Sequence, residues 1–258
     1  MTAYLLSSLL LPSFSIPIAL SVGRKSQNKA AMAILSFSIL DLLLILSTFP
    51  EVLSRGEYSE AYYWIPMLGS PLTFFIDGIS LSIVTMTLIL VISSIIFSMG
   101  YMERGRSLPE YYALLALLTI GLVGVFISSN LMIFYFCWEF MLIPTYFIIG
   151  GWGYRESYRA AFKFFIFTHA GAVAVLLGIG AIYMLTGNLD MLQAKALLAT
   201  APQGLLRWVF IAFTLGFAVK MAIVPLHMWL PDAHSEAPAP MSALLSGVII
   251  EAGAYALF

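Results

Sequence analysis

The stretch that decides the fold is KMAIVPLHMWLPDAH, at residues 220–234. It follows a long apolar segment and brings a lysine, two histidines and two prolines close together in the chain. Pro225 and Pro231 lack a backbone N–H, so each should break or kink a helix that runs through this stretch. Broken helices occur inside membranes where the backbone lines a cavity or is covered by protein. The stretch therefore predicts a broken transmembrane helix beside a hydrated path.

Three ionisable side chains of this stretch recur at a spacing of seven residues. Lys220, His227 and His234 are each two helical turns apart, so a continuous helix would carry them on one face. Histidine titrates near neutral pH, which suits the passage of protons. A metal site of His227, Asp232 and His234 is the weaker interpretation, because the spacing of the histidines matches no common ligand pattern and no cysteine assists. We expect a proton half-channel without a bound metal.

The composition of the whole chain is that of a polytopic membrane protein. Of its 258 residues, 61% are apolar and 10% are charged, whereas soluble domains carry about 45–50% and about 25%. The net charge of −1 offers no basic field for a nucleic acid. The single cysteine, Cys137, excludes a disulfide framework and a cysteine-based metal cluster. The expected surroundings are a lipid bilayer and other membrane proteins, with no nucleic acid.

Apolar runs long enough to cross a membrane, about 20 residues each, cover most of the chain. The predicted spans are 2–22, 30–49, 78–101, 110–128, 131–150, 161–187, 205–230 and 241–258. They do not alternate with the period of two that barrel strands require. The predicted fold class is an all-α membrane helix bundle of about eight transmembrane helices, the seventh of them broken.

The two longest connections and the basic residues predict how the bundle is oriented. Segment 50–77, with the breakers Pro66 and Pro71, should be an outer loop with irregular or hairpin structure. Segment 188–204 should be a second outer loop, with a short surface helix near 192–199. The predicted inner loops carry Arg24, Lys25, Lys29, Arg104, Arg106, Arg155, Arg159 and Lys163, and the outer segments only Arg55, Lys195 and Arg207. This excess places the N-terminus outside.

Ionisable residues inside a span are costly in lipid and usually have a role. Asp41, Glu139, Lys220 and Glu251 lie well inside the predicted spans. A glutamate and a lysine that face each other can exchange a proton, so we predict a Glu139–Lys220 relay. The alternative is a buried ion pair that only fixes helix packing. Asp41 has no evident partner, and packing through a hydrogen bond is an equal alternative for it. His169 is expected to be a satisfied core histidine.

Several motifs resemble those of one family. They are Trp138-Glu139, AVKM at 218–221, the run 225–234, DGIS at 77–80 and APAPMSAL at 237–244. From about residue 70 to residue 258 the chain resembles the antiporter-like, proton-translocating subunits of complex I. The nearest resemblance is to subunit M of NADH-quinone oxidoreductase and its archaeal counterparts. The run at 225–244 is the most specific part of this resemblance.

The resemblance implies a function, partners and a location. The chain would be a membrane subunit of a proton-translocating NADH-quinone-type oxidoreductase, or of a relative with another donor, in the inner (plasma) membrane. Glu139 and Lys220 would form its switched pair, and the proton path would continue through His227, Asp232, His234 and Glu251. Redox chemistry would lie in other subunits, reached through neighbouring membrane subunits, so no cofactor, flavin or iron–sulfur cluster is expected in this chain.

The sequence departs from that family in two respects. Family members have about fourteen helices in which two repeats of five are inverted, whereas this sequence holds three N-terminal helices, residues 1–109, and the first repeat, residues 110–258. It would be a fragment, a split gene product or a truncated subunit. Glu251 stands where many members have lysine, which leaves the order of charge transfer open. A subunit of a multisubunit sodium/proton antiporter and a non-pumping scaffold are the alternative functions.

Overall fold

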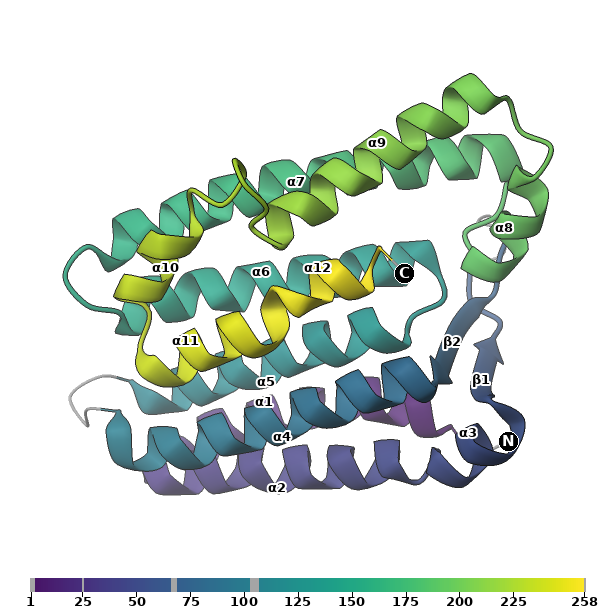
Figure 1. Ribbon diagram of the computed structural model, residues 1–258. Helices are drawn as coiled ribbons and strands as arrows, with labels where there is room; N and C mark the ends of the chain where they lie inside the picture. The colour runs from purple at the N-terminus through teal and green to yellow at the C-terminus, as the bar shows by residue number, and fades with distance from the viewer. Residues whose placement is uncertain (1–2, 25, 66–68, 103–106, 258) are drawn as a thin grey trace.

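The computed structural model describes residues 3–24, 26–65, 69–102 and 107–257. Predicted features at Lys25, Pro66, Arg104, Arg106 and Phe258 lie outside the described residues. Figure 1 shows a bundle of long helices that run side by side, with one β-hairpin at one end. The predicted helix bundle is confirmed, and its helices coincide closely with the apolar runs of the sequence.

Seven helices of the described chain are long and apolar enough to cross a membrane. They are α1 (Tyr4–Gly23), α2 (Gln27–Leu46), α4 (Gly78–Tyr101), α5 (Leu108–Ile127), α6 (Leu131–Trp152), α7 (Ser157–Thr186) and α9 (Gln203–Lys220). The other elements are α3 (Phe49–Arg55), β1 (Glu57–Tyr62), β2 (Leu72–Asp77), α8 (Met191–Leu198), α10 (Leu230–Glu236), α11 (Ala239–Leu244), the π-helical turn η2 (Leu245–Ile249) and α12 (Glu251–Tyr255). The eighth predicted span corresponds to the shorter apolar helix Ala239–Tyr255, which includes the π-helical turn.

The bundle has two chemically different ends (Figure 1). The hairpin end carries α3, the β1–β2 hairpin and α8, which confirms the hairpin predicted within 50–77 and the helix predicted near 192–199. Strand β1 pairs antiparallel with β2, with Glu57 opposite Asp77 and Tyr62 opposite Leu72. The opposite end carries the connections that follow α1 and α6, together with α10. It is here called the basic end, because Arg24, Lys29, Arg155, Arg159 and Lys163 lie there.

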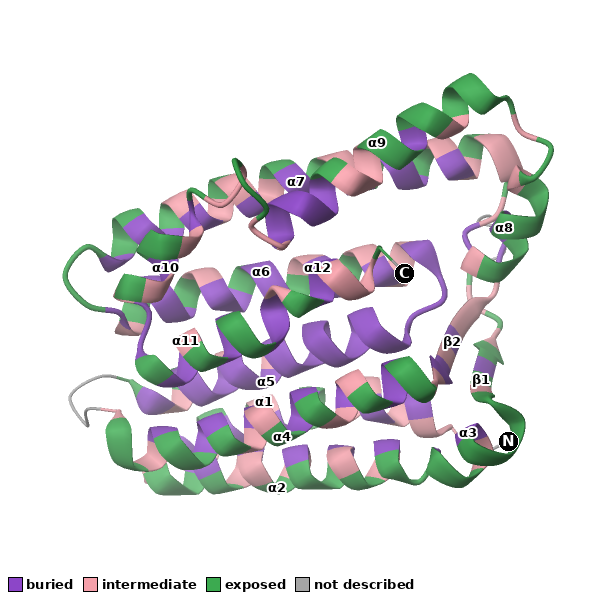
Figure 2. Cartoon of the chain, in the orientation of Figure 1, coloured by how far each residue is buried: buried purple, intermediate pink, exposed green. Residues whose placement is uncertain are grey.

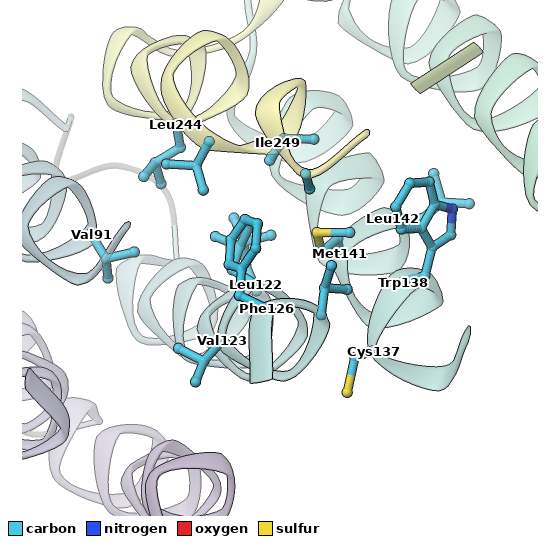
Figure 3. Close-up of a cluster of buried hydrophobic side chains, with 14 of the residues drawn as sticks. Val91, Leu122, Val123, Phe126, Cys137, Trp138, Met141, Leu142, Leu244 and Ile249 are labelled. Atoms are coloured by element: carbon cyan, nitrogen blue, oxygen red, sulfur yellow. The ribbon is translucent and has the colours of Figure 1, made fainter. Parts of the chain in front are cut away.

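Helix α5 forms the centre of the bundle (Figure 2). It packs against α1, α2, α4 and α6, and so contacts both of the predicted segments 1–109 and 110–258. Gly121 permits a close approach of α6, because a Cβ atom there would lie 2.7 Å from the backbone N of Met141. Figure 3 shows the resulting apolar cluster, in which Val91 of α4, Phe126 of α5 and Leu244 of α11 lie around the same centre.

A buried carboxylate fastens the hairpin to the first helix. Glu60 of β1 is 5% exposed and accepts hydrogen bonds from the backbone N of Leu5 (2.9 Å) and of Leu6 (3.1 Å). The hydroxyls of Tyr58 and Tyr62 donate to the same carboxylate at 3.0 and 2.9 Å. The first backbone N–H groups of a helix have no partner within the helix. Glu60 therefore satisfies the start of α1 from another element and fixes the hairpin against it.

Candidate functional site

The seventh long helix, α9, ends at Lys220, and the helical path is interrupted directly after this residue. Residues 221–229 form turns, and α10 begins at Leu230. Figure 1 shows that α9 ends about midway along α7, between the two ends of the bundle. The predicted break is confirmed, but the predicted stripe of Lys220, His227 and His234 on one helix face is wrong. Because residues 221–229 form turns and not a helix, the spacing of seven residues does not correspond to two helical turns.

Trp229 holds the two sides of this break together. Its indole Nε1 donates to the carbonyl oxygen of Val219 (3.0 Å), which also accepts from the backbone N of Ala222 (3.2 Å). Trp229 is fully buried, with its ring 5.2 Å from that of Phe164 on α7. Ala222 adopts the left-handed conformation at φ +53°, which L side chains rarely adopt. Trp229 thus anchors the break to α7 and α9.

Lys220 lies in the interior at the level of the break. The residue is 2% exposed, and its Nζ lies 5.3 Å from the centre of the Trp138 ring, a cation–π distance. Small residues bring α9 close to α7, because a Cβ atom on Gly216 would lie 2.6 Å from the carbonyl oxygen of Gly171. A lysine so deep in a membrane helix bundle is expensive to maintain, which makes Lys220 a candidate functional residue.

Glu139 of α6 is next to Trp138 and acts electrostatically on Lys220. Within the described residues, no ion pair of 4.0 Å or less joins Glu139 to Lys220. The Oε2 of Glu139 lies instead 3.3 Å from Nδ1 of His169 on α7, and the side chains are 18% and 45% exposed. Glu139 therefore has two basic side chains as neighbours, one deep in the bundle and one near its surface.

His169 is not the satisfied core histidine that the sequence predicts. Its ring stacks on Phe165 at 5.4 Å, and its side chain is half-exposed. Its Nδ1 is buried towards Glu139, yet neither that atom nor Oε1 of Glu139 has a hydrogen-bond partner within the described part of the chain. Which side of α7 faces α6 depends on helix packing, so the sequence alone gave no signal for this pair.

The other predicted path residues are placed separately. His227 lies in the break, with a buried Nδ1 that lacks a hydrogen-bond partner among the described residues. His234 of α10 bonds the hydroxyl of Ser242 through Nδ1 (2.7 Å). Glu251 is exposed on α12, two residues from Gly253, which packs against α9. Since residues two apart point away from each other on a helix, Glu251 faces away from Lys220.

Two further polar pairs lie in the bundle. Asp232 of α10 accepts a hydrogen bond from Lys163 of α7 (Nζ–Oδ2 2.7 Å), a contact that the sequence did not indicate because Lys163 was counted only for its charge. Asp41 is fully buried and accepts a hydrogen bond from the hydroxyl of Ser8. The groups of His, Cys, Asp and Glu in the described chain include no set of three that could hold a metal ion.

Two cavities lie on either side of the break along the bundle, and no residue of 221–229 is among those that line them. One of about 730 Å³ opens near the hairpin end and reaches Thr214 and Phe217, within two turns of Lys220 on α9. Another of about 370 Å³ lies at the basic end and is lined by Tyr154, His234 and Ser242. Burial lowers the pKa of His234 below its usual value. A neutral imidazole at neutral pH can accept or donate a proton there.

Comparison with known proteins gives a consistent result. The model of the family described as "NADH:quinone oxidoreductase/Mrp antiporter, TM" matches residues 128–258, just over half of the chain. NADH-ubiquinone oxidoreductase chain 4 of Chondrus crispus is 33% identical over 236 residues, which are 91% of this chain and 47% of that protein. F(420)H(2) dehydrogenase subunit M of Methanosarcina mazei is 32% identical over 81% of this chain and 43% of its own length.

Solved structures share the fold. A chain of the archaeal membrane-bound sulfane sulfur reductase superposes with a TM-score of 0.85 at 25% identity, over 97% of this chain and 39% of that one. A chain of the Mrp complex from Dietzia sp. superposes with a TM-score of 0.82 at 21% identity, over 98% of this chain and 27% of that one. The chain thus spans about half the length, or less, of the proteins that it matches.

Proposed function

The chain belongs to the NADH:quinone oxidoreductase/Mrp antiporter transmembrane family, and we propose on that premise that it moves protons as a membrane subunit of a complex I-like redox assembly. In this proposal Glu139 and Lys220 are the relay at the centre of the bundle. The redox reaction takes place in other subunits, and this chain contributes the coupled proton transfer.

One observation carries the proposal: the buried Lys220 at the end of a broken helix, with Glu139 close enough to act on it. A lysine and a glutamate that interact without a direct bridge can take up and release protons as their separation changes. A pair that only fixed helix packing would be expected to form a direct, fully hydrogen-bonded bridge, because unpaired polar groups in a membrane interior are costly. The missing bridge favours a relay over a packing role.

The remaining parts of the path extend from this pair. His227 within the break and His234 at the cavity of the basic end would connect Lys220 to that end, with Asp232 beside them. Glu251 would accept the proton beyond Lys220 after a rearrangement of α12. The excess of Lys and Arg at the basic end supports an inner location of that end, with the N-terminus outside and the chain in the plasma membrane.

The partners follow from the relatives, which include subunits of multisubunit membrane assemblies. We propose that other membrane subunits flank this chain and connect it to a redox arm. The family description covers Mrp antiporters as well, and this makes the sodium/proton antiporter the function to exclude.

The test is proton transport by the native membrane complex, purified in mild detergent, analysed by mass spectrometry and reconstituted into liposomes. Glu139→Gln and Lys220→Ala should each lower proton uptake at least about tenfold, since each removes a group that accepts or donates the proton. Both variants should still assemble. Ile211→Val, a change at an exposed apolar position of α9, is the control that should transport normally.

The other outcomes separate the competing functions. Copurification of redox subunits, with transport that depends on the electron donor, supports the redox pump. Transport driven by a sodium gradient without a redox subunit would identify an antiporter. Unchanged transport in both variants would leave the chain as a scaffold and overturn the relay.

A further inference from the structure

A second proton-accepting side chain adjoins Glu139 on the surface of the bundle. His169 of α7 places Nδ1 3.3 Å from Oε2 of Glu139, and that nitrogen is buried while the side chain as a whole is 45% exposed. The buried edge of the ring therefore faces the carboxylate, and the rest of it faces outward. The two ring nitrogens of histidine are chemically distinct, and such a side chain can take a proton on one and pass a proton from the other.

The surface around His169 is apolar. Ile166 and Val173, three residues before it and four after it on α7, are 49% and 42% exposed, and the helical repeat places them on the same face. Phe140 of α6 is exposed next to Glu139. A histidine within an apolar membrane face is rare and is normally turned towards protein or water. Packing alone does not account for a half-exposed imidazole at this position.

Solvent exposure decreases from His169 through Glu139 to Lys220. The side chain of His169 is 45% exposed and that of Glu139 is 18% exposed, whereas Lys220 as a residue is 2% exposed. Glu139 interacts with both of the others, at 3.3 Å with His169 and electrostatically with Lys220. Its Oε1 has no hydrogen-bond partner in the described chain, so no hydrogen bond to that oxygen holds the carboxylate towards either neighbour.

We propose that His169 is a proton-carrying residue that exchanges protons with Glu139 at the lateral surface of the bundle, so that Glu139 alternates between His169 and Lys220. This inference rests on the proposed function. In the exchange, the N–H bond of the His169 imidazolium breaks, its electron pair stays on Nδ1, and an O–H bond forms on Oε2 of Glu139. Glu139 then passes the proton to neutral Lys220, which restores the carboxylate and gives an ammonium.

The elements packed around His169 carry several titratable or charged groups. Helix α6 contributes Glu139, with Tyr135 one turn earlier and interacting with it, and Tyr146, which packs on Phe165. Helix α9 contributes Lys220, and α7 itself carries Lys163, which is bound to Asp232 of α10. Within the described residues, Glu139 is the carboxylate that contacts the ring. A change at His169 should therefore be visible in a signal from Glu139.

The experiment uses the native complex in liposomes, with proton uptake measured from pH 5.5 to pH 8.5. His169→Gln keeps a polar side chain of similar size but cannot carry a proton. We expect it to lower transport at least about tenfold and to change how the transport rate depends on pH, because an amide cannot exchange the proton. Ile166→Gln places the same amide one turn away on the same face, and should stay within about twofold of wild type.

An infrared measurement provides a readout that a structural role would not change. The C=O band of protonated Glu139, identified by its loss in Glu139→Gln, should shift in His169→Gln and stay in place in Ile166→Gln. His169→Asn is the second variant and should behave as His169→Gln does.

The outcomes distinguish this inference from the proposed function. If His169→Gln transports within twofold of wild type with an unchanged pH profile while Glu139→Gln is inactive, His169 is not on the path and the relay stands. If Glu139→Gln and Lys220→Ala also transport normally, both proposals are wrong. If both His169 variants fail to assemble while Ile166→Gln assembles, His169 is a packing residue and the inference is overturned.

Discussion

Two glutamates of this chain are surrounded in opposite ways. Glu60 at the hairpin end accepts four hydrogen bonds from four donors and holds the start of α1. Glu139 of α6 has one oxygen without a hydrogen-bond partner within the described residues and one oxygen near a histidine. A carboxylate whose lone pairs are all occupied stabilises one arrangement, whereas an incompletely bonded one can change partners. The difference distinguishes a structural carboxylate, Glu60, from the carboxylate that we propose carries protons, Glu139.

The substitution with the largest expected effect on the free energy of unfolding is Glu60→Ala, and it tests this contrast directly. Glu60→Ala leaves the N–H groups of Leu5 and Leu6 and two tyrosine hydroxyls without their acceptor, and should destabilise the fold by about 2–4 kcal/mol. Glu139→Ala should cost less stability, since it breaks fewer hydrogen bonds. Thermal unfolding of the detergent-solubilised complex measures both.

Proton transport by the same two variants is the second measurement in this comparison of Glu60 with Glu139. Complexes with Glu60→Ala that do assemble should pump at the wild-type rate for each assembled complex, whereas Glu139→Ala complexes should not pump. Equal destabilisation by the two substitutions would contradict the distinction drawn between the two glutamates.

A medium effect is expected from pH at the basic end. Burial lowers the pKa of His234, so the folded state resists protonation at a pH where the unfolded chain accepts a proton. The stability of the folded chain should therefore fall as pH drops below about 6.5, the usual histidine value, and continue to fall until the pH passes the lowered pKa. His234→Gln should reduce this decline between pH 7.5 and pH 5.5, as measured by the unfolding midpoint.

His169→Gln is the comparison variant for this measurement of the unfolding midpoint. His169 lies beside a carboxylate, whereas His234 lies beside a hydroxyl. An acid sensitivity that stays the same without His234 would show that its burial does not control the decline.

The smallest effect is expected at the ion pair of Lys163 and Asp232. The two side chains are 32% and 52% exposed, and water therefore screens their attraction. Exposed pairs contribute about 0–1 kcal/mol, so Lys163→Gln should change the unfolding midpoint only slightly. A loss as large as that for Glu60→Ala would mean that a partner covers this pair in the assembled complex.

The sequence predicts the parts of the fold that depend on local chemistry. The long apolar runs gave the helices, and the breakers in 50–77 and 220–234 gave the hairpin and the break. The prolines show where a helix cannot continue, but not where the chain goes next, and so the predicted stripe of Lys220 with two histidines was wrong. The turn through Trp229 depends on contacts of that side chain with Val219 of α9 and Phe164 of α7, which are distant in sequence from each other.

Contacts between elements were the part that the sequence could not predict. The pairing of Glu139 with His169 depends on how α6 and α7 are rotated about their axes, which a purely apolar surface leaves unspecified. Glu60 looks like an ordinary loop residue until the hairpin folds against α1. The family motifs identified Glu139 and Lys220, and the structure places them near each other without a direct bridge. Their roles as proton carriers stay predictions.

The end of α9 at Lys220 also sets the electrostatics of the site. The backbone dipoles of a helix add up to roughly half a negative elementary charge at its C-terminus, where they stabilise a cation by about 0.3–2 kcal/mol. Because α9 stops at this residue, Lys220 is in the last turn of the helix, near that negative end. An unbroken helix would carry its terminal charge several turns further along. Lys220 thus keeps a fixed counter-charge, supplied by the main chain, while the Glu139 carboxylate turns towards His169.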